Sequence, residues 1–264
     1  MKKRIDILLV EKGLAKSREN AKTLIIAGEV TAAGRQVKVP SEQYEEEAEI
    51  VVRGDACPYV SRGGWKLEKA LKEFPIILTG KVCMDIGAST GGFTDCMLQN
   101  GASFVYAVDV GYGQFDWKLR NDERVKLMER TNARYLERQD KAVDFVSVDV
   151  SFISLSLIFP AILKVIAEDA KIVTLIKPQF EAGREFVGKK GVVRDPDVHC
   201  AVISKVLESA KSYGLICGGL TFSPVKGPNG NIEYLAYFVT VADKKIEIDK
   251  EKVKEVVERS HIVL

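Results

Sequence analysis

The stretch Val82-Cys-Met-Asp-Ile-Gly-Ala-Ser-Thr-Gly-Gly-Phe93 decides the fold of this 264-residue chain. An apolar run around Asp85 is followed by glycines at 87, 91 and 92, and a helical pattern then begins at about residue 91. Glycine takes backbone conformations that a side chain forbids, and it lets a ligand approach the main chain closely. The stretch therefore predicts a strand, a tight turn and a helix whose first N–H groups face a nucleotide.

The spacing of the glycines separates the classes of nucleotide site. Gly87 is followed by Ala88, Ser89 and Thr90, which departs from the dinucleotide pattern G-x-G-x-x-G, and no Gly-Lys-Ser/Thr of a P-loop follows. The next apolar stretch ends in Asp109, about twenty residues after the glycines, where a carboxylate can bind ribose hydroxyls. On the first motif alone, a glycine-rich turn without a ligand is the alternative.

The run from Asp85 to Phe93 resembles the first motif of class I S-adenosylmethionine-dependent methyltransferases. In that family the acidic residue and the glycine turn cradle the amino-acid part of the cofactor. The resemblance implies S-adenosyl-L-methionine as the cofactor. The residues expected to bind it are Asp85, Gly87, Ser89, Gly91, Gly92 and Phe93 near the methionine end, Asp109 at the ribose and Asn132 at the adenine.

The composition is that of an ordinary globular protein with room for one large domain, or for a large and a small one. Hydrophobic residues make up 46% of the chain, and its net charge is +2. No apolar run approaches the roughly 20 residues of a membrane span, and the basic start of the chain lacks the long apolar segment of a signal peptide. Five cysteines without C-x-x-C spacing predict neither a zinc site nor a disulfide framework. We therefore expect a cytoplasmic protein.

Positive charge is concentrated at the start of the chain. Residues 1–38 hold nine Lys or Arg and four Asp or Glu, a balance of +5. Apolar residues at helical spacing predict two short amphipathic helices, the first closed by Gly13 and the second capped by Ser17. Short strands are expected within 28–34, 36–39 and 48–52.

Residues 4–9, 13–18, 21–25 and 28–30 resemble the S4 RNA-binding domain closely. In that family the helix corresponding to Ser17 and Arg18 lies with the following hairpin against structured RNA. Such recognition depends on shape and phosphates, because A-form RNA hides its base edges in a deep groove. The residues expected to contact RNA are Lys16, Arg18, Lys22, Arg35 and Lys38; the alternative is an ordinary solvated face.

The rest of the chain alternates between strand and helix patterns. Strands are expected near 81–86, 103–109, 124–128, 143–148, 171–176, 214–222 and 233–241, and helices near 63–74, 91–100, 114–120, 133–138, 155–167 and 197–212. Such alternation predicts an α/β fold with a seven-stranded, mainly parallel sheet and helices on both faces. The resemblance to class I methyltransferases implies that this fold is Rossmann-like. The predicted domains are an α+β S4 domain at 1–58, a linker at 59–63 and a methyltransferase domain at 64–264.

Two charged residues follow strands of this sheet. Asp149 follows the strand near 143–148, and Lys177 follows the strand near 171–176, where Pro178 stops further pairing. Ligands of such sheets bind beyond the carboxyl ends of the strands. A carboxylate and an amine buried there are costly unless they are paired or functional, and a structural ion pair is the alternative.

With Lys66 in Ser61-Arg-Gly-Gly-Trp-Lys and Glu233 in Gly-Asn-Ile-Glu-Tyr, these two residues match the Lys-Asp-Lys-Glu tetrad of FtsJ-type ribose 2′-O-methyltransferases. The whole chain, with an S4 domain in front, resembles the TlyA family, whose members methylate ribosomal RNA and are described in places as hemolysin A. The resemblance implies transfer of a methyl group to a cytidine 2′-hydroxyl of ribosomal RNA.

As a mechanism, we expect Lys177 to accept the proton of the 2′-hydroxyl, with Asp149 orienting it. Lys66 would be the second cation, held together with the hydroxyl by Glu233. The expected partner is ribosomal RNA or a ribosomal subunit, for a monomer that needs neither a metal nor a membrane. The alternative functions are a membrane-active cytolysin and a non-catalytic RNA-binding assembly factor.

Overall fold

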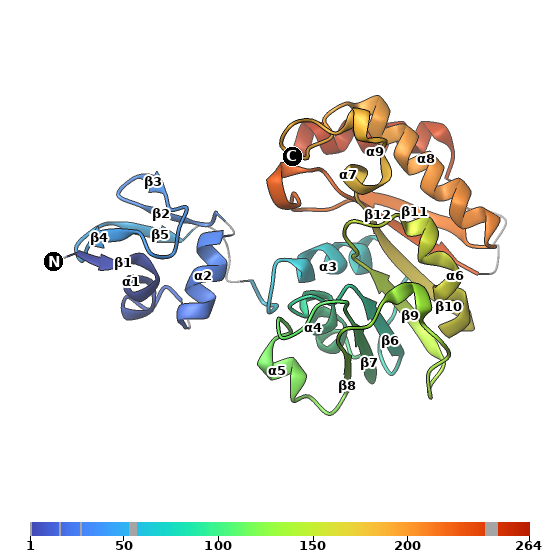
Figure 1. Cartoon of the computed structure of the whole chain (residues 1–264), viewed down its shortest axis with the longest axis horizontal. Helices are drawn as coiled ribbons and strands as arrows, with labels where there is room; N and C mark the ends of the chain where they lie inside the picture. The colour runs from blue at the N-terminus through green and yellow to red at the C-terminus, as the bar shows by residue number, and fades with distance from the viewer. Residues whose placement is uncertain (1, 16, 27, 53–56, 241–247) are drawn as a thin grey trace. The chain divides into compact units, whose positions relative to one another are not determined.

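The computed structural model describes residues 2–15, 17–26, 28–52, 57–240 and 248–264 (Figure 1). The chain divides into two compact units, Met1–Pro58 and Tyr59–Leu264. Each unit has its own buried core, and each is described by itself below.

The small unit combines two helices with two short sheets. Its elements are β1 (Lys2–Arg4), α1 (Ile5–Glu11), α2 (Arg18–Ile26), β2 (Val30–Ala32), β3 (Arg35–Gln36), β4 (Gln43–Glu45) and β5 (Ile50–Val52). Strand β1 pairs with β4, and the second sheet has the order β3-β2-β5. The core is formed by apolar side chains of α1, α2 and β2, among them Ile5, Leu9, Ala21, Ile25 and Val30.

The expected ends of the two helices are present. Gly13 follows α1 with φ +70°, and the backbone N–H of Asn20 donates to Oγ of Ser17 at 3.1 Å. Strands β1 and β4 were not predicted. Each is three residues long and carries mainly charged or polar side chains, so no apolar alternation marks it.

The large unit is built on the predicted seven-stranded sheet. Its strands are β6 (Val82–Ile86), β7 (Phe104–Val108), β8 (Val125–Met128), β9 (Val143–Val148), β10 (Ile166–Ile176), β11 (Ile216–Phe222) and β12 (Tyr234–Val239). The strand order is β11-β12-β10-β9-β6-β7-β8, in which β12 runs antiparallel to both neighbours and the other pairs are parallel. The predicted α/β class with a mainly parallel sheet is therefore confirmed.

Helices lie on both faces of this sheet (Figure 1). They are α3 (Gly63–Glu73), α4 (Gly92–Gln99), α5 (Trp117–Arg120), α6 (Phe159–Val165), α7 (Pro178–Glu181), α8 (Pro196–Ser212) and α9 (Lys250–Val263), with short 3-10 turns η1 (Ala133–Tyr135), η2 (Leu155–Leu157), η3 (Arg184–Phe186) and η4 (Pro228–Gly230). Buried side chains of α6, α8 and α9 join one core cluster with alternate residues of the strands. Asp85, on the opposite face of β6, contacts α4.

Two expectations about helices need correction. The helix expected at 155–167 is split into η2 and α6, because Pro160 is accommodated only in the first turn of a helix. The helix expected at 133–138 is a 3-10 turn of three residues. Asn132 caps this turn by accepting the backbone N–H of Arg134.

The segment 59–63, expected to be a linker, packs against the large unit. Tyr59 is buried, and the N–H of Val60 donates to Oδ2 of Asp95 in α4 at 2.9 Å. The buried ring of Tyr59 and the carboxylate of Asp95 therefore fix this segment. The nearby Gly and Pro residues were the reason for expecting a linker.

The order of the strands determines where a ligand can bind. The chain runs outward from β6 through β7 to β8, and it then returns to β9 on the other side of β6. Ligands of such sheets bind at this reversal, beyond the carboxyl ends of the strands. The end of β6 is the glycine turn, and the end of β9 is Asp149.

Candidate active site

The turn after β6 is held by neighbouring strands. The N–H groups of Gly87 and Ala88 both donate to the carbonyl of Val108 in β7, at 2.8 and 3.0 Å. Gly87 has φ +87°, and a Cβ there would lie 2.4 Å from the carbonyl oxygen of Asp149. Glycine at this position therefore lets the main chain of Asp149 come close to the turn.

Asp85 lies beneath the turn, and its carboxylate is fully buried. It accepts hydrogen bonds from the N–H and Oγ1 of Thr94 at 2.9 and 2.7 Å, and from Oγ of Ser147 at 3.0 Å. Burial raises the pKa of Asp85 to about 7, although these hydrogen bonds act in the opposite direction. Its contacts connect β6, β9 and the start of α4, so they explain why an acidic residue stands before the glycines.

A cavity of about 820 Å³ opens at the carboxyl ends of β6, β7 and β9. Four of the residues expected to bind the cofactor line it: Gly87, Ser89, Asp109 and Asn132. Asp85, Gly91, Gly92 and Phe93 are not among its lining residues. A Cβ on Gly91 would meet Leu119, and one on Gly92 would meet Ser61, so both glycines serve the packing of the turn.

Asp109 organises the mouth of this cavity. Its Oδ2 accepts the N–H of Ser89 at 2.7 Å, and its Oδ1 accepts the N–H of Gly111 at 2.6 Å. The carboxylate therefore joins the glycine turn to the loop after β7. Ser89 itself has φ +50°, an uncommon conformation for a residue with a side chain.

These residues fit S-adenosylmethionine in size and chemistry. The cavity volume lies within the range of about 300–1,000 Å³ that small-molecule sites span. It offers a carboxylate at the end of β7 for ribose hydroxyls and the amide of Asn132 farther along, as a nucleoside requires. Asp149 and Ser151 also line it, so its inner part reaches the charged cluster described next.

Four ionisable side chains from distant segments converge in this cluster. Nζ of Lys177 lies 2.5 Å from Oδ1 of Asp149, and Nζ of Lys66 lies 3.5 Å from Oδ2 of the same carboxylate. Lys66 Nζ also lies 2.7 Å from Oε2 of Glu233. Lys177 Nζ in addition donates to Oγ of Ser151 at 3.0 Å. The four residues matched to the tetrad therefore form one continuous chain of ion pairs.

The cluster is almost closed to solvent. Lys66 and Lys177 are 9% and 8% exposed, and Glu233 is fully buried. Burial lowers the pKa of Lys66, but Asp149 and Glu233 outweigh it and raise that pKa overall. Burial likewise acts to raise the pKa of Asp149, and the two ammonium groups lower it. Two cations thus balance two anions, as buried charges require.

The sequence analysis missed an aromatic pair at the edge of the cavity. Phe152 is 90% exposed with φ +63°, and its ring centroid lies 4.8 Å from that of Phe180. Nζ of Lys177 lies 5.9 Å from the Phe180 ring centroid. In the sequence, this pair is indicated only by Phe152, an aromatic residue in the run that follows Asp149 at the end of a strand.

Glu181 was not predicted either, and it fixes the loop that carries Phe152. Its carboxylate accepts from Oγ of Ser154 and from the N–H of Leu155, both at 2.7 Å. These bonds tie the segment after β9 to α7, which directly follows Lys177. The loops on either side of the charged cluster therefore hold each other.

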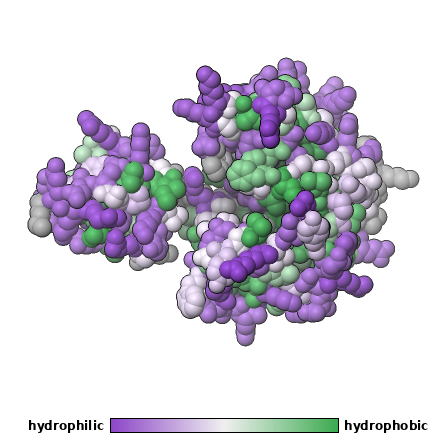
Figure 2. Space-filling model, in the orientation of Figure 1, coloured by the Kyte–Doolittle hydropathy of each residue, from purple (hydrophilic) through white to green (hydrophobic). Residues whose placement is uncertain are grey.

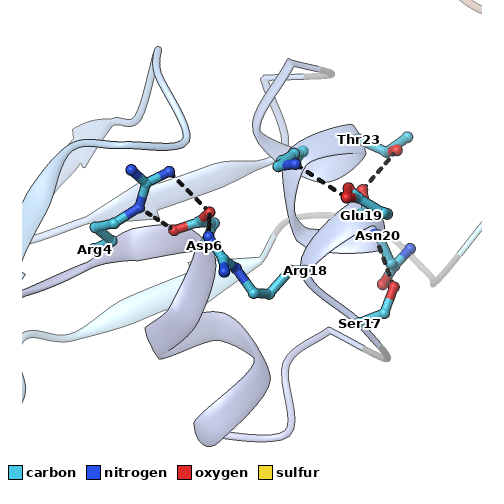
Figure 3. Close-up of polar contacts among 8 residues, drawn as sticks. Arg4, Asp6, Ser17, Arg18, Glu19, Asn20 and Thr23 are labelled. Carbon is cyan, nitrogen blue, oxygen red and sulfur yellow. Dashed lines mark hydrogen bonds and ion pairs between the residues drawn. The ribbon is translucent and has the colours of Figure 1, made fainter.

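In the small unit, one buried acid organises two arginines (Figure 3). Arg4 binds both carboxylate oxygens of Asp6 at 3.0 and 3.1 Å, and Arg18 binds Oδ2 at 3.0 Å. The Arg4 contact, with Arg18 beside it, lowers the pKa of Asp6 to about 2 although burial opposes the shift. Both guanidinium groups remain partly exposed, so the pair presents positive charge at a fixed place.

The other residues expected to contact RNA differ in their surroundings. Lys22 pairs with Glu19 at 3.1 Å. Arg35 and Lys38 are exposed, and Lys16 lies outside the described residues. Hydrophilic side chains cover much of the face of this unit seen in Figure 2.

Within the described ranges, no group of three His, Cys, Asp or Glu side chains could hold a metal ion. No helix in the described part of the chain is long and apolar enough to cross a membrane.

The sheet order, the glycine turn and the cavity with its terminal carboxylate together define a class I methyltransferase. The FtsJ-like methyltransferase family model matches residues 59–239, and the S4 domain model matches residues 3–50. The chain belongs to the FtsJ-like methyltransferase family and carries an S4 domain ahead of the methyltransferase unit. Members of this family use S-adenosylmethionine as the methyl donor.

Similar proteins share this organisation over nearly their whole length. YqxC of Bacillus subtilis is 50% identical over 268 residues, which cover 100% of this chain and 95% of YqxC. TlyA of Mycobacterium tuberculosis, named a 16S/23S rRNA (cytidine-2′-O)-methyltransferase, is 44% identical over 92% of each chain. A solved structure described as a hemolysin from Streptococcus thermophilus is 46% identical, with a TM-score of 0.80 over 99% of this chain and 96% of that chain.

Proposed function

We propose that this protein transfers a methyl group from S-adenosylmethionine to the 2′-hydroxyl of a cytidine in ribosomal RNA. The observation that carries the proposal is the convergence of Lys66, Asp149, Lys177 and Glu233 beside the cofactor-sized cavity. The name of the similar M. tuberculosis protein supports the substrate. The S4 domain supports RNA as the partner.

The sulfonium of the cofactor supplies an electrophilic methyl group, and the chain must present a hydroxyl to it in line. Lys177 accepts the proton of that hydroxyl through Nζ, once this amine has released its own proton. Asp149 orients Lys177 through the ion pair at 2.5 Å and stabilises the ammonium that forms. Ser151 Oγ fixes the same amine from a second side.

Lys66 and Glu233 hold the other side of the hydroxyl. Lys66 stays a cation between two carboxylates, so it attracts electron density on the ribose oxygen. Oε1 of Glu233 is buried and has no hydrogen-bond partner among the described residues. An acceptor left in this state favours a donor from a bound ligand, while the ribose hydroxyl directs its own proton to Lys177.

The aromatic pair gives the target base a surface to stack on. Phe152 stands exposed beside the reactive cluster and packs against Phe180. Aromatic rings bind bases that have left their own stack, and each such contact contributes about 1–3 kcal/mol. Stacking here brings the ribose of the same nucleotide toward Lys177.

The small unit supplies affinity for structured RNA through the two arginines around Asp6. Guanidinium groups in a fixed arrangement bind phosphate oxygens in pairs, and Arg18 is therefore retained as a phosphate contact. We also propose that Lys16, Lys22, Arg35 and Lys38 contact RNA. The protein then acts in the cytoplasm, as a monomer, on ribosomal RNA or a ribosomal subunit.

The test is to identify the product. Ribosomal RNA that lacks the modification is incubated with the protein and S-adenosylmethionine, and its nucleosides are then separated by mass spectrometry. We expect 2′-O-methylcytidine at defined positions, from free RNA or from one of the subunits. Methylation only on a base would contradict the ribose assignment, and no transfer to any of these substrates would contradict the function.

A cytolysin is the second function that the names of relatives raise. The amphipathic stretch that could serve it, α9, uses its apolar side chains Val253, Val256 and Val257 in the core of the large unit. Leakage of dye from liposomes, measured beside the methylation assay, separates the two functions.

A further inference from the structure

We propose that the large unit carries its own RNA phosphate-binding surface, formed by the loop between α7 and α8 together with Lys226. This surface, the basic loop surface, consists of Arg184, Lys189, Lys190, Arg194 and Lys226. The proposal rests on the proposed function in taking RNA as the partner, and it adds a contact region beyond the S4 domain and the tetrad.

The charges of this surface are not compensated. All five side chains are exposed, and none of them makes an ion pair with a described residue. Within the loop, residues 182–195, four cations stand against two acids, Glu185 and Asp195. Elsewhere on the large unit, cations such as Lys164 and Arg120 are paired with nearby glutamates. An unpaired group of like charges raises the local potential and favours an anionic partner.

The middle of the loop is held rigidly. Asn231 is 2% exposed, and its Oδ1 accepts the N–H of Val193 at 3.1 Å while its Nδ2 donates to the carbonyl of Gly191 at 2.8 Å. The N–H groups of Gly188 and Gly191 close the turn by donating to the carbonyls of Val192 and Gly188. Lys189 and Lys190 stand within this turn, so less of their backbone entropy is lost when they bind.

The same contacts place the loop at the reactive edge of the sheet. Asn231 stands two residues before Glu233, and the loop begins directly after Glu181, which binds the segment following β9. β12 begins where β10 ends, since Tyr234 pairs with Ile176. The lysine turn is therefore fixed to the segment that carries one of the four reactive residues.

The chemistry of the surface fits an RNA backbone. Lysine and arginine neutralise phosphates without reading sequence, and bound counterions are released as they do so. Phe186 is 52% exposed within the loop and adds an aromatic face between the cations. Cations interleaved with an aromatic ring are typical of surfaces that follow a nucleic-acid strand. RNA that continues beyond the target ribose would pass over this loop.

The test uses the full-length protein and the double variant Lys189→Gln/Lys190→Gln. Binding of a fluorescently labelled RNA hairpin is measured over a range of salt concentrations. Loss of two phosphate contacts should reduce the slope of log affinity against log salt by about 1.4–1.8. In the methylation assay with protein-free ribosomal RNA, KM for RNA should rise severalfold while kcat changes little.

The matched control is Lys72→Gln/Lys81→Gln, which removes the same charge near the amino ends of the strands. Lys72 is exposed and Lys81 is half-buried, and both form surface ion pairs that contribute little to stability. The control should keep the wild-type slope. An unchanged slope in Lys189→Gln/Lys190→Gln, or an equal fall in the control, would overturn the proposal. Wild-type protein that binds the hairpin with the predicted slopes but methylates no RNA would refute the proposed function and leave the surface standing.

Discussion

Burial acts to lower the pKa of Lys66, and two carboxylate neighbours raise it. The residue is therefore a fixed cation in a pocket that would otherwise hold an excess of negative charge. Glu233 depends on it most, because Glu233 is fully buried and its Oε2 lies 2.7 Å from the ammonium. Because Glu233 depends on Lys66 in this way, substitutions at the two positions can distinguish a contribution to stability from a contribution to catalysis.

We expect Lys66→Met to lower the free energy of unfolding by about 3–5 kcal/mol, because it leaves a buried carboxylate unpaired. The double variant Lys66→Met/Glu233→Leu should recover most of that loss and remain inactive. Urea unfolding and methyl transfer, measured on both variants, test this. A single variant as stable as the wild type, or a double variant with activity, would contradict the assignment.

The sequence predicted the members of the charged cluster better than their surroundings. Asp149, Lys177 and Glu233 adjoin strands whose patterns were evident, so their convergence followed from the topology. Phe152 and Glu181 gave no such signal, since one is exposed on a loop and the other is buried by tertiary contacts. Asp85 stood in the expected motif, and its hydrogen bonds to Thr94 and Ser147 required the packing of α4 and β9.

At the scale of elements, the turn between β6 and α4 controls the cavity. Gly91 is the N-terminal cap of α4 with φ +97°, and a Cβ there would lie 2.5 Å from Cδ1 of Leu119. Both the backbone conformation and the space therefore require glycine. The helix cannot begin at this place with another residue unless the turn moves.

Gly91→Ala should lower the free energy of unfolding by about 1–3 kcal/mol through backbone strain, and the clash with Leu119 should lower it further. Affinity for S-adenosylmethionine should fall with stability, because Ser89 and Gly87 lie in the same turn. Gly80→Ala is the control: Gly80 has φ +74° but open space around its Cβ position. Calorimetric unfolding and titration with the cofactor are measured on both variants. Equal losses of stability and of cofactor affinity in the two variants would show that backbone strain alone, and not the clash, causes the effect.

Strand and helix patterns predicted most of the elements of the large unit, because long apolar strands alternate with amphipathic helices there. They failed where an element is short or interrupted. Pro160 delays α6, and β1 and β4 carry polar side chains with no apolar alternation. Such elements form because partners elsewhere in the chain supply their hydrogen bonds, which a local pattern does not contain.

At the scale of the whole molecule, a buried histidine joins three elements of the large unit. Nδ1 of His199 in α8 lies 2.7 Å from the hydroxyl of Tyr234 in β12 and 3.1 Å from Nε2 of His261 in α9. Its Nε2 lies 3.1 Å from the carbonyl of Val193. Burial lowers the pKa of His199 to about 4, with His261 acting in the same direction.

A histidine whose folded pKa is depressed binds fewer protons in the folded state than in the unfolded state. The contribution of His199 to the free energy of unfolding should therefore be fully present above about pH 6.5, and it should be lost as the pH falls from there toward 4. Urea unfolding between these values should show the loss, and His199→Gln should reduce its pH dependence. Equal dependence in both proteins would assign the effect to other groups.

In the proposed function both units bind RNA, and the large unit also binds the cofactor and performs the transfer. The step on which this function most depends is the transfer of the ribose hydroxyl proton to Lys177. Lys177→Arg tests this directly, because arginine keeps the charge and does not release its proton in proteins. Lys171→Arg, in the middle of the same strand, is the matched control. We predict that Lys177→Arg binds S-adenosylmethionine normally and transfers no measurable methyl group to ribosomal RNA, while Lys171→Arg transfers at the wild-type rate. Transfer by Lys177→Arg at the rate of the control would contradict the account.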